Sequence, residues 1–168
     1  MDIKELTILI DSREQLPLSF RGISTLRAGL KTGDYSCTAN GIDLRDVVAI
    51  ERKSIGDLLG CIGGQRDRFE RELERLAKLR YRALVIEGSI VDLVDATAGR
   101  RLTPRQVLGS VLAWIWKFNC PPIFSDNRTA AAVVVATLLR HAARYALADR
   151  TGPGIAGAAM EPEERGLS

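Results

Sequence analysis

The sequence predicts a mixed α/β domain, because short strand-like runs alternate with helical patterns along a chain of 168 residues. Continuous apolar runs such as Leu6–Ile10 are typical of buried strands, and apolar residues at helical spacing recur in later segments. Hydrophobic residues make up 46% of the chain, which is enough to form a core in a domain of this length. We therefore expect one domain and find no internal repeat.

The first third of the chain is predicted to form strands. The expected strands are Leu6–Ile10, Ser24–Ala28, Gly33–Thr38 and Val47–Ile50, the last continuing through Glu51-Arg52-Lys53. Asn40-Gly41 lies between strand-like flanks, and this dipeptide favours a tight hairpin turn. The hairpin is expected to fold the strand after Gly33 back against the strand that carries Glu51.

The middle of the chain is predicted to be largely helical. Ser54 can cap a helix over Ile55–Cys61, and Gly63-Gly64 breaks it. A second helix is expected from Gln65 to Leu79, with Phe69, Leu73 and Leu76 on one face, followed by a buried strand within Arg82–Glu87.

The last third of the chain carries clear helix-start signals. A short helix is expected over Ser89–Ala96. Thr103-Pro104-Arg105-Gln106 places Thr as the cap, Pro in the first turn and Gln three residues after the cap, so a helix should run to Phe118. A strand at Ile123-Phe124 and a helix over Arg128–Asp149 complete the folded domain, residues 1–149, and residues 150–168 are expected to be a flexible tail.

Composition excludes several classes of protein. Three separate cysteines without a C-x-x-C pair argue against a disulfide framework and a zinc site, and a single histidine excludes histidine-rich metal sites. No uninterrupted apolar run approaches the ~18 residues that span a bilayer, so we expect no membrane association. The charged amino terminus is unlike a signal peptide, and we expect a reduced, cytoplasmic protein, associated with the nucleoid if its substrate is DNA. The net charge of +3 permits nucleic-acid binding.

A group of charged residues gathers where the predicted strands end. Side chains alternate along a strand, so Glu51 and Lys53 project from one face and Arg52 from the other. Taken alone, Glu51 and Lys53 read most simply as a surface ion pair. The predicted hairpin, however, brings Asp34 towards Glu51, and Asp11 ends the neighbouring strand. Carboxylates converging beside a lysine are suited to a hard divalent ion that activates water at a phosphoryl group.

The spacing of these residues resembles a known signature. Gly33-Asp34, followed by Glu51-Arg52-Lys53 and then by Asp57, is similar to the G-D-Xn-E-R-K-X3-D motif of the XPF-type structure-specific endonucleases. Asp11-Ser12-Arg13-Glu14 resembles the first-strand element of that family, and Gly64-Gln65-Arg66 resembles its later helix start. The similarity extends over residues 6–145.

The resemblance implies a restriction-endonuclease-like fold, a central mixed sheet flanked by helices, and cleavage of DNA that depends on Mg²⁺ or Mn²⁺. By this likeness Asp34 and Glu51 would hold the metal, Lys53 would assist the attacking water, and Asp11 would be a further ligand or would orient one. The remaining positions that match the family would support the site; they are Arg13, Glu14, Arg52 and Asp57. Because Arg52 points away from Glu51, we expect it to brace the strand by contacting a neighbour such as a carboxylate.

The sequence departs from the family in one respect that bears on substrate choice. Members usually carry a tandem helix-hairpin-helix module after the nuclease, whereas only a short segment follows the last predicted helix here, so a stand-alone form is expected. Branched or flapped DNA in repair or recombination is the expected substrate. The alternatives are an inactive DNA-binding or scaffold subunit, whose family counterparts lack the acidic and lysine positions, and an exonuclease or recombination nuclease of the same fold.

Two further expectations concern contacts with partners. Arg66 follows Gly63-Gly64 at a helix start, where free N–H groups favour an anion, and Arg68 begins a basic stripe; both are candidate DNA contacts, although a solvated helix face explains the stripe as well. Ala130–Leu139 is apolar on nearly every side, which predicts a homodimer through the C-terminal helices unless the helix carrying Trp114 and Trp116 covers it.

Overall fold

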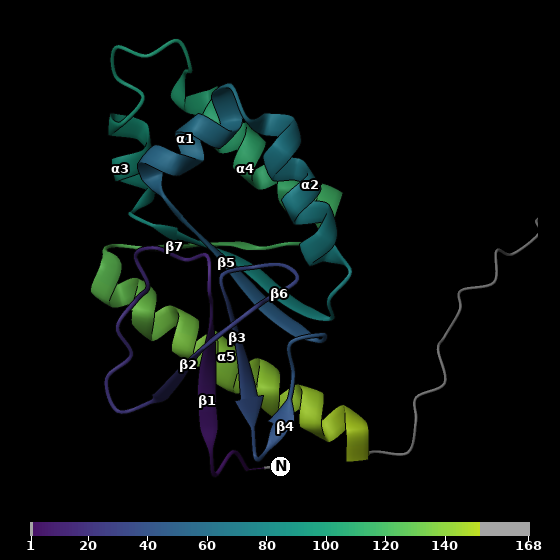
Figure 1. The fold of residues 1–168 in the computed structure, drawn as a ribbon. Helices are drawn as coiled ribbons and strands as arrows, with labels where there is room; N and C mark the ends of the chain where they lie inside the picture. The colour runs from purple at the N-terminus through teal and green to yellow at the C-terminus, as the bar shows by residue number, and fades with distance from the viewer. Residues whose placement is uncertain (1, 152–168) are drawn as a thin grey trace, which may run out of the picture.

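The computed structural model describes residues 2–151, and within them the expected alternation of strands and helices forms one seven-stranded sheet with helices on both sides (Figure 1). The strands are β1 (Leu6–Asp11), β2 (Ser24–Ala28), β3 (Tyr35–Ala39), β4 (Ile42–Asp43), β5 (Val48–Ser54), β6 (Tyr81–Glu87) and β7 (Pro122–Ser125). The helices are α1 (Ile55–Gly63), α2 (Arg66–Ala77), α3 (Ile90–Asp95), α4 (Pro104–Phe118) and α5 (Arg128–Thr151). Almost all of the predicted tail, residues 152–168, lies outside the described residues.

The sheet is mixed, with the order β2-β1-β3-β5-β6-β7 and β4 attached to β3. β3 is antiparallel to β1, β4 and β5, whereas β5, β6 and β7 are parallel to one another. The Asn40-Gly41 turn is present, and both residues have positive φ, 49° and 76°, as a tight hairpin turn requires. β4 contains only two residues, and the opposite end of β3 pairs with β5 at Tyr35 and Ile50.

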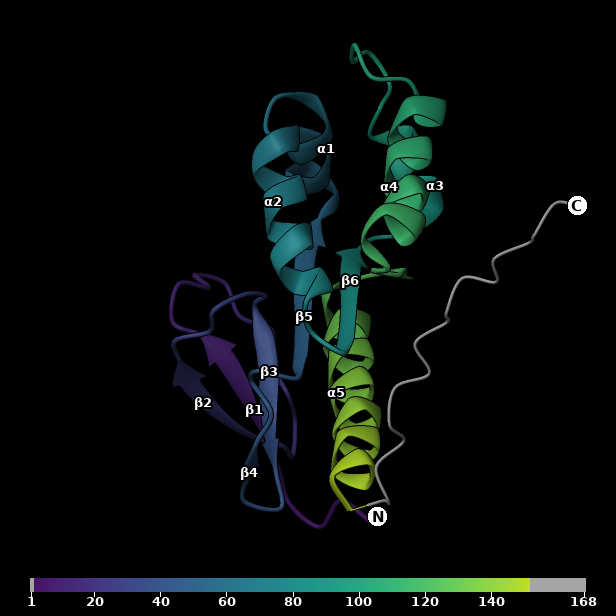
Figure 2. The same cartoon turned by 90° about the vertical axis from the view of Figure 1, so that its right-hand side faces the viewer.

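The alternation of side chains along β5 and β6 divides the core into two layers. Val48, Ile50 and Val85 face the layer that contains α5, whereas Ala49 and Leu84 face the layer of α1, α2 and α4. Figure 2 shows α5 lying along one face of the sheet, with the other helices gathered beyond its opposite side. Strands buried on both faces explain why their sequences read as continuous apolar runs.

The capping signals in the sequence are all used. Ser54 accepts from the backbone N–H of Asp57, and Ser89 and Thr103 each form a reciprocal capping box, with Asp92 and Gln106 respectively. Helix boundaries differ from the prediction by one or two residues. For example, α2 ends at Ala77 rather than at Leu79, so Arg82 belongs to a strand and cannot extend a basic stripe on that helix.

The helix carrying the two tryptophans does not lie over the apolar face of α5. Trp114 is buried in the layer of α1 and α2, where it packs edge-on against Phe69, whereas Trp116 on the same helix is 88% exposed. The apolar segment predicted in α5 instead rests on the sheet through Ala131, Val135 and Leu139.

One helix of the described chain, over Arg128–Arg150, is long and apolar enough by length and composition to cross a membrane, with a mean hydropathy of 1.2. The buried residues on the inner side of α5 form a large part of one core layer, as in the central helix of a globular domain. Its apolar character is therefore explained by packing against the sheet.

The two-layer core predicts an asymmetric response to truncation along α5. Leu139→Ala removes a side chain that is fully buried and should lower the free energy of unfolding by about 2–4 kcal/mol. Val133→Ala on the same helix truncates an exposed side chain and should change it by less than about 0.5 kcal/mol. Urea denaturation followed by circular dichroism measures both values, and equal losses would contradict this packing of α5.

Candidate active site

A close approach of two strands places Asp34 beside β5. Gly33, at φ 76°, precedes β3, and a Cβ atom at this position would meet Ala49 Cβ at 2.9 Å and the carbonyl oxygen of Ile50 at 3.1 Å. The adjoining backbone is tied on both sides, since Asp34 N–H donates to Ile50 O at 2.9 Å and Asp11 N–H donates to Asp34 O at 2.9 Å. A glycine is therefore required at position 33 for Asp34 to reach the strand that carries Glu51.

Asp34 and Glu51 are held from two directions at one cavity. The backbone N–H of Arg52 donates to Asp34 Oδ2 at 2.8 Å, and Lys53 Nζ donates to Glu51 Oε1 at 2.7 Å. These two bonds engage one oxygen of each carboxylate. A cavity of about 400 Å³ is lined by both carboxylates and by Lys53, so the strand alternation and the hairpin together assemble the predicted group.

Burial dominates the electrostatics of the two carboxyl groups. Desolvation, reinforced by the Glu51 charge, raises the pKa of Asp34 to about 7. Desolvation also raises the pKa of Glu51, although Lys53 acts in the opposite direction. Two desolvated carboxylates that share a cavity resist simultaneous ionisation, and a bound cation would remove that resistance.

Lys53 lies among acidic groups and against an aromatic ring. Its burial alone would lower its pKa, but the charges of Glu51, Asp34 and Glu72 outweigh that effect and the pKa of Lys53 is raised. The ammonium lies 5.0 Å from the centre of the Phe69 ring and 3.9 Å from Glu72 Oε2. Lys53 therefore stays protonated at neutral pH and acts as a fixed positive charge rather than as a base.

Glu72 is a residue of this cavity that the sequence analysis missed. It lines the cavity from α2, together with Arg68 and Arg75. Its position depends on how α2 docks against β5, and the spacing of residues in the sequence carries no signal for that docking.

Arg52 braces the ends of the strands, as the alternation of β5 predicts. Its guanidinium lies 2.5 Å from Glu87 Oε2 and 3.4 Å from Glu14 Oε2, and it donates to the carbonyl oxygen of Leu16 at 3.2 Å. Arg52 Nε is a buried atom without a hydrogen-bond partner in the described part of the chain. The side chain thus joins β5, β6 and the segment after β1 beneath the cavity.

Asp11 lines the same cavity as Asp34 and Glu51, and its carboxylate is held there by Arg13. Both oxygens of its carboxylate accept hydrogen bonds from the Arg13 side chain, with Nε at 2.8 Å and Nη2 at 2.9 Å. The backbone N–H groups of Arg13, at 2.7 Å, and of Leu30, at 3.0 Å, add two more. The side-chain hydrogen bond from Arg13 lowers the pKa of Asp11 to about 2, despite burial. Among the described residues no group of three or more His, Cys, Asp or Glu side chains is arranged to hold a metal ion.

Of the other predicted site residues, Arg68 lines the cavity of Glu51, whereas Asp57 and Arg66 make contacts elsewhere. Asp57 lies in the first turn of α1 and supports its Ser54 cap, because its backbone N–H donates to Ser54 Oγ at 3.1 Å and its carboxylate accepts from Ser54 Oγ at 2.7 Å. Arg66 pairs with Glu70 and donates to Ser110 Oγ at 3.0 Å, and it lines a separate cavity between α2 and α4. Arg68 lines the same cavity as Glu51, with its exposed side chain 3.8 Å from Glu72.

The donor set fits a hard divalent cation. Asp34 and Glu51 offer carboxylate oxygens, the ligands that Mg²⁺ and Mn²⁺ prefer, and the described cavity contains no histidine or cysteine that would select a softer metal. Magnesium commonly binds through one or two carboxylates and retains several waters, so two protein ligands are sufficient.

Comparisons with known proteins agree with this geometry. A family model described as the ERCC4 domain matches residues 2–138. The chain is also similar to two solved structures, XPF from Aeropyrum pernix and the same protein in complex with DNA. Each has 19% identity and a TM-score of 0.63, and the alignments cover 86% and 88% of this chain and 68% of each matched chain. No curated protein matches the sequence. The expected restriction-endonuclease-like fold is confirmed.

The raised pKa of Asp34 predicts a stability that depends on pH. The folded state disfavours the charged carboxylate, so ionisation destabilises the fold progressively as pH rises from the ordinary value of 3.8 to about 7. In EDTA, Asp34→Asn should therefore raise the free energy of unfolding by about 1–4 kcal/mol at pH 8 and by little near pH 4. The amide oxygen can still accept from Arg52 N–H.

Urea unfolding of both proteins at pH 4, 6 and 8 measures this difference. Asp46→Asn is the control, because Asp46 is an exposed carboxylate and its replacement should give a small difference at every pH. An Asp34→Asn effect that is the same at pH 4 and pH 8 would contradict the electrostatic account.

Proposed function

The chain belongs to the ERCC4 domain family, and from this premise we propose that it is a metal-dependent endonuclease that hydrolyses phosphodiester bonds in DNA. The observation that supports this most directly is the joint placement of Asp34, Glu51 and Lys53 at one cavity. An inactive scaffold has no need for two carboxylates whose burial costs stability, so the active form is favoured over the inactive alternative.

The residues of the cavity would have separate roles in hydrolysis. Asp34 and Glu51 would hold Mg²⁺ or Mn²⁺, which supplies Lewis-acid polarisation of a phosphoryl oxygen when bound. Lys53, fixed by its 2.7 Å contact with Glu51, would orient the attacking water and stabilise the negative charge that develops on the phosphate. Arg52 keeps the strand ends in position from the opposite face of β5.

Asp11 has a supporting part in this scheme. Its bonds with Arg13 and Leu30 fix the segment after β1, and its backbone N–H holds the carbonyl of Asp34. We therefore assign Asp11 and Arg13 to positioning Asp34.

For the substrate we propose branched or flapped DNA, as expected for the family type. A panel of labelled flap, fork, bubble, single-stranded and duplex DNAs with added magnesium tests this choice. Comparing circular with linear DNA separates an endonuclease from an exonuclease of the same fold, because only an endonuclease opens a closed circle.

Glu51→Gln should reduce the cleavage rate by at least about 100-fold while the protein stays folded, since the neutral amide is a poor ligand for a divalent ion. Lys53→Ala and added EDTA should give comparable losses. The measurement is the single-turnover rate on the best DNA of the panel, with circular dichroism as the check on folding. Glu74→Gln, an exposed residue of α2, is the matched control and should keep the parent rate.

We also propose that the chain forms a homodimer through its C-terminal helices. Strand β7 is an edge of the sheet and contacts both α4 and α5. Trp116 on α4 is 88% exposed and Tyr145 on α5 is 56% exposed. Large exposed apolar side chains on the helices that flank an edge strand are typical of an interface between copies.

Light scattering coupled to gel filtration at low micromolar concentration should give the mass of a dimer. Trp116→Glu should shift this mass to that of a monomer without unfolding the chain, because the side chain is almost fully exposed. Leu26→Glu is the control, since Leu26 is an exposed residue on β2 at the other edge of the sheet, and it should remain dimeric. A monomer mass for the unaltered chain would defeat the proposal.

A further inference from the structure

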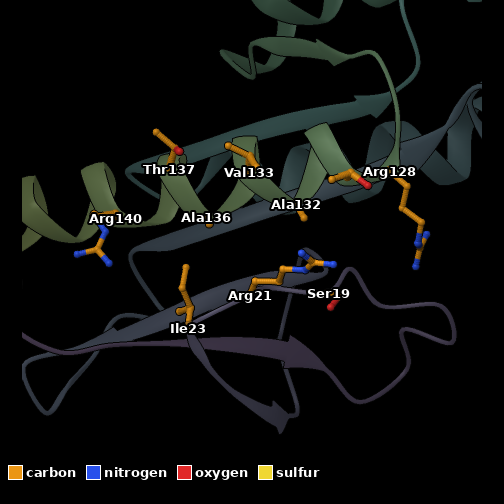
Figure 3. A pocket seen from close by; sticks show the side chains of 10 residues that line it. Ser19, Arg21, Ile23, Arg128, Ala132, Val133, Ala136, Thr137 and Arg140 are labelled. Carbon is orange, nitrogen blue, oxygen red and sulfur yellow. The ribbon is translucent and has the colours of Figure 1, made fainter.

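The largest of the cavities described lies on the other side of the sheet from Glu51 and Lys53. It is a groove of about 600 Å³ between the outer side of α5 and the segment before β2, and Figure 3 shows its two walls. Arg128, Thr137 and Arg140 come from α5, whereas Ser19 and Arg21 face them from the segment before β2. We call this the arginine groove.

The arginine groove has a strong excess of positive charge. Its lining, within the described chain, includes three arginines and no carboxylate. Arg21 and Arg140 are exposed and form no ion pair with another described residue, so both guanidinium groups are available to an anion. Hydroxyl groups of Ser19, Thr129 and Thr137 lie among them as further hydrogen-bond donors.

Arg128 fixes one end of the groove next to the catalytic region. It donates to the carbonyl oxygens of Leu16 and Pro17 at 2.6 and 2.7 Å, and it lies 3.6 Å from Glu87, the carboxylate that also pairs with Arg52. Arg128 thereby links the start of α5 to the strand ends that support Glu51.

A single loop separates the groove from the catalytic cavity. Glu14 and Gln15 line the catalytic cavity, Ser19 lines the arginine groove, and Leu16 between them is 70% exposed. The loop over residues 14–19 therefore has one end at the catalytic cavity and the other at the arginine groove.

The dimensions suit several phosphates in a row. Arg128 and Arg140 are separated along α5 by about 18 Å, at the helical rise of 1.5 Å per residue. That span corresponds to about five nucleotides of one duplex strand at 3.4 Å each. Guanidinium and hydroxyl groups are the side chains that most often contact phosphate oxygens.

We propose that the arginine groove binds the sugar–phosphate backbone of DNA whose neighbouring part occupies the catalytic cavity. Arg21 and Arg140 contact phosphates, and Arg128 anchors the wall against which the backbone lies. This inference rests on the proposed nuclease function. The arginine groove would let this chain bind DNA through its own residues and independently of base sequence, because it contacts only the backbone.

The test is fluorescence anisotropy with a labelled flap DNA in EDTA, so that no cleavage occurs. Arg21→Ala/Arg140→Ala should weaken binding by about tenfold near 0.1 M salt and should reduce the slope of log affinity against log salt by about 1.8, for two phosphate contacts. The matched control is Arg100→Ala/Arg101→Ala, which removes the same charge from exposed residues in the loop before α4. This control should retain the parent affinity and slope.

A cross-linking measurement locates the contact directly. The three native cysteines are buried, so Thr137→Cys introduces one exposed thiol into the groove. It should form a disulfide, by thiol–disulfide exchange, with DNA that carries an activated mixed disulfide tethered to a backbone phosphate and that releases its leaving thiol; Arg101→Cys should not.

The outcomes separate this inference from the proposed function. In one outcome the unaltered chain cleaves the flap DNA with magnesium, but Arg21→Ala/Arg140→Ala keeps the parent affinity. That outcome would support the nuclease function and contradict the proposed role of the arginine groove. Equal weakening by the control pair would attribute the effect to total charge and would also overturn it. If the unaltered chain neither binds nor cleaves the DNA, the proposed function and the inference fail together.

Discussion

The repulsion between the two desolvated carboxylates of Asp34 and Glu51 is the constraint to which the neighbouring structure responds. Each carboxylate has one oxygen fixed by a donor, Arg52 N–H for Asp34 and Lys53 for Glu51. The braces beneath them, from Arg52 to Glu14 and Glu87, prevent the strands from separating to relieve the repulsion. The buried carboxylates thus destabilise the fold locally, and the packing of the two core layers offsets this loss. The same arrangement is common at charged functional sites.

Much of this arrangement could be predicted from the sequence, because it depends on local rules. The alternation of side chains in β5 predicted that Glu51 and Lys53 share a face and that Arg52 does not, and the Asn40-Gly41 turn predicted the hairpin. Ser54, Ser89 and Thr103 marked helix starts correctly because a cap acts within four residues of itself.

The parts that could not be predicted depend on how distant elements dock. Glu72 reaches Lys53 only because α2 packs across the end of β5, and Arg66 turns towards α4 because Glu70 and Ser110 hold it there. Trp114 and Trp116 are two residues apart, yet one is buried and the other exposed, since helical geometry places them on different sides of α4. No spacing rule reveals which side meets the rest of the protein.

Gly33 has a consequence for the interpretation of genetic variants in this chain. A Cβ atom there would lie 2.9 Å from Ala49 Cβ, so almost any replacement displaces the turn that carries Asp34. A mutational screen scored by loss of function would then rank position 33 beside the acidic residues, although glycine offers no side chain for the chemistry. Sorting such a screen by phenotype alone would therefore confuse a residue that is needed for backbone geometry with the residues that take part in the reaction.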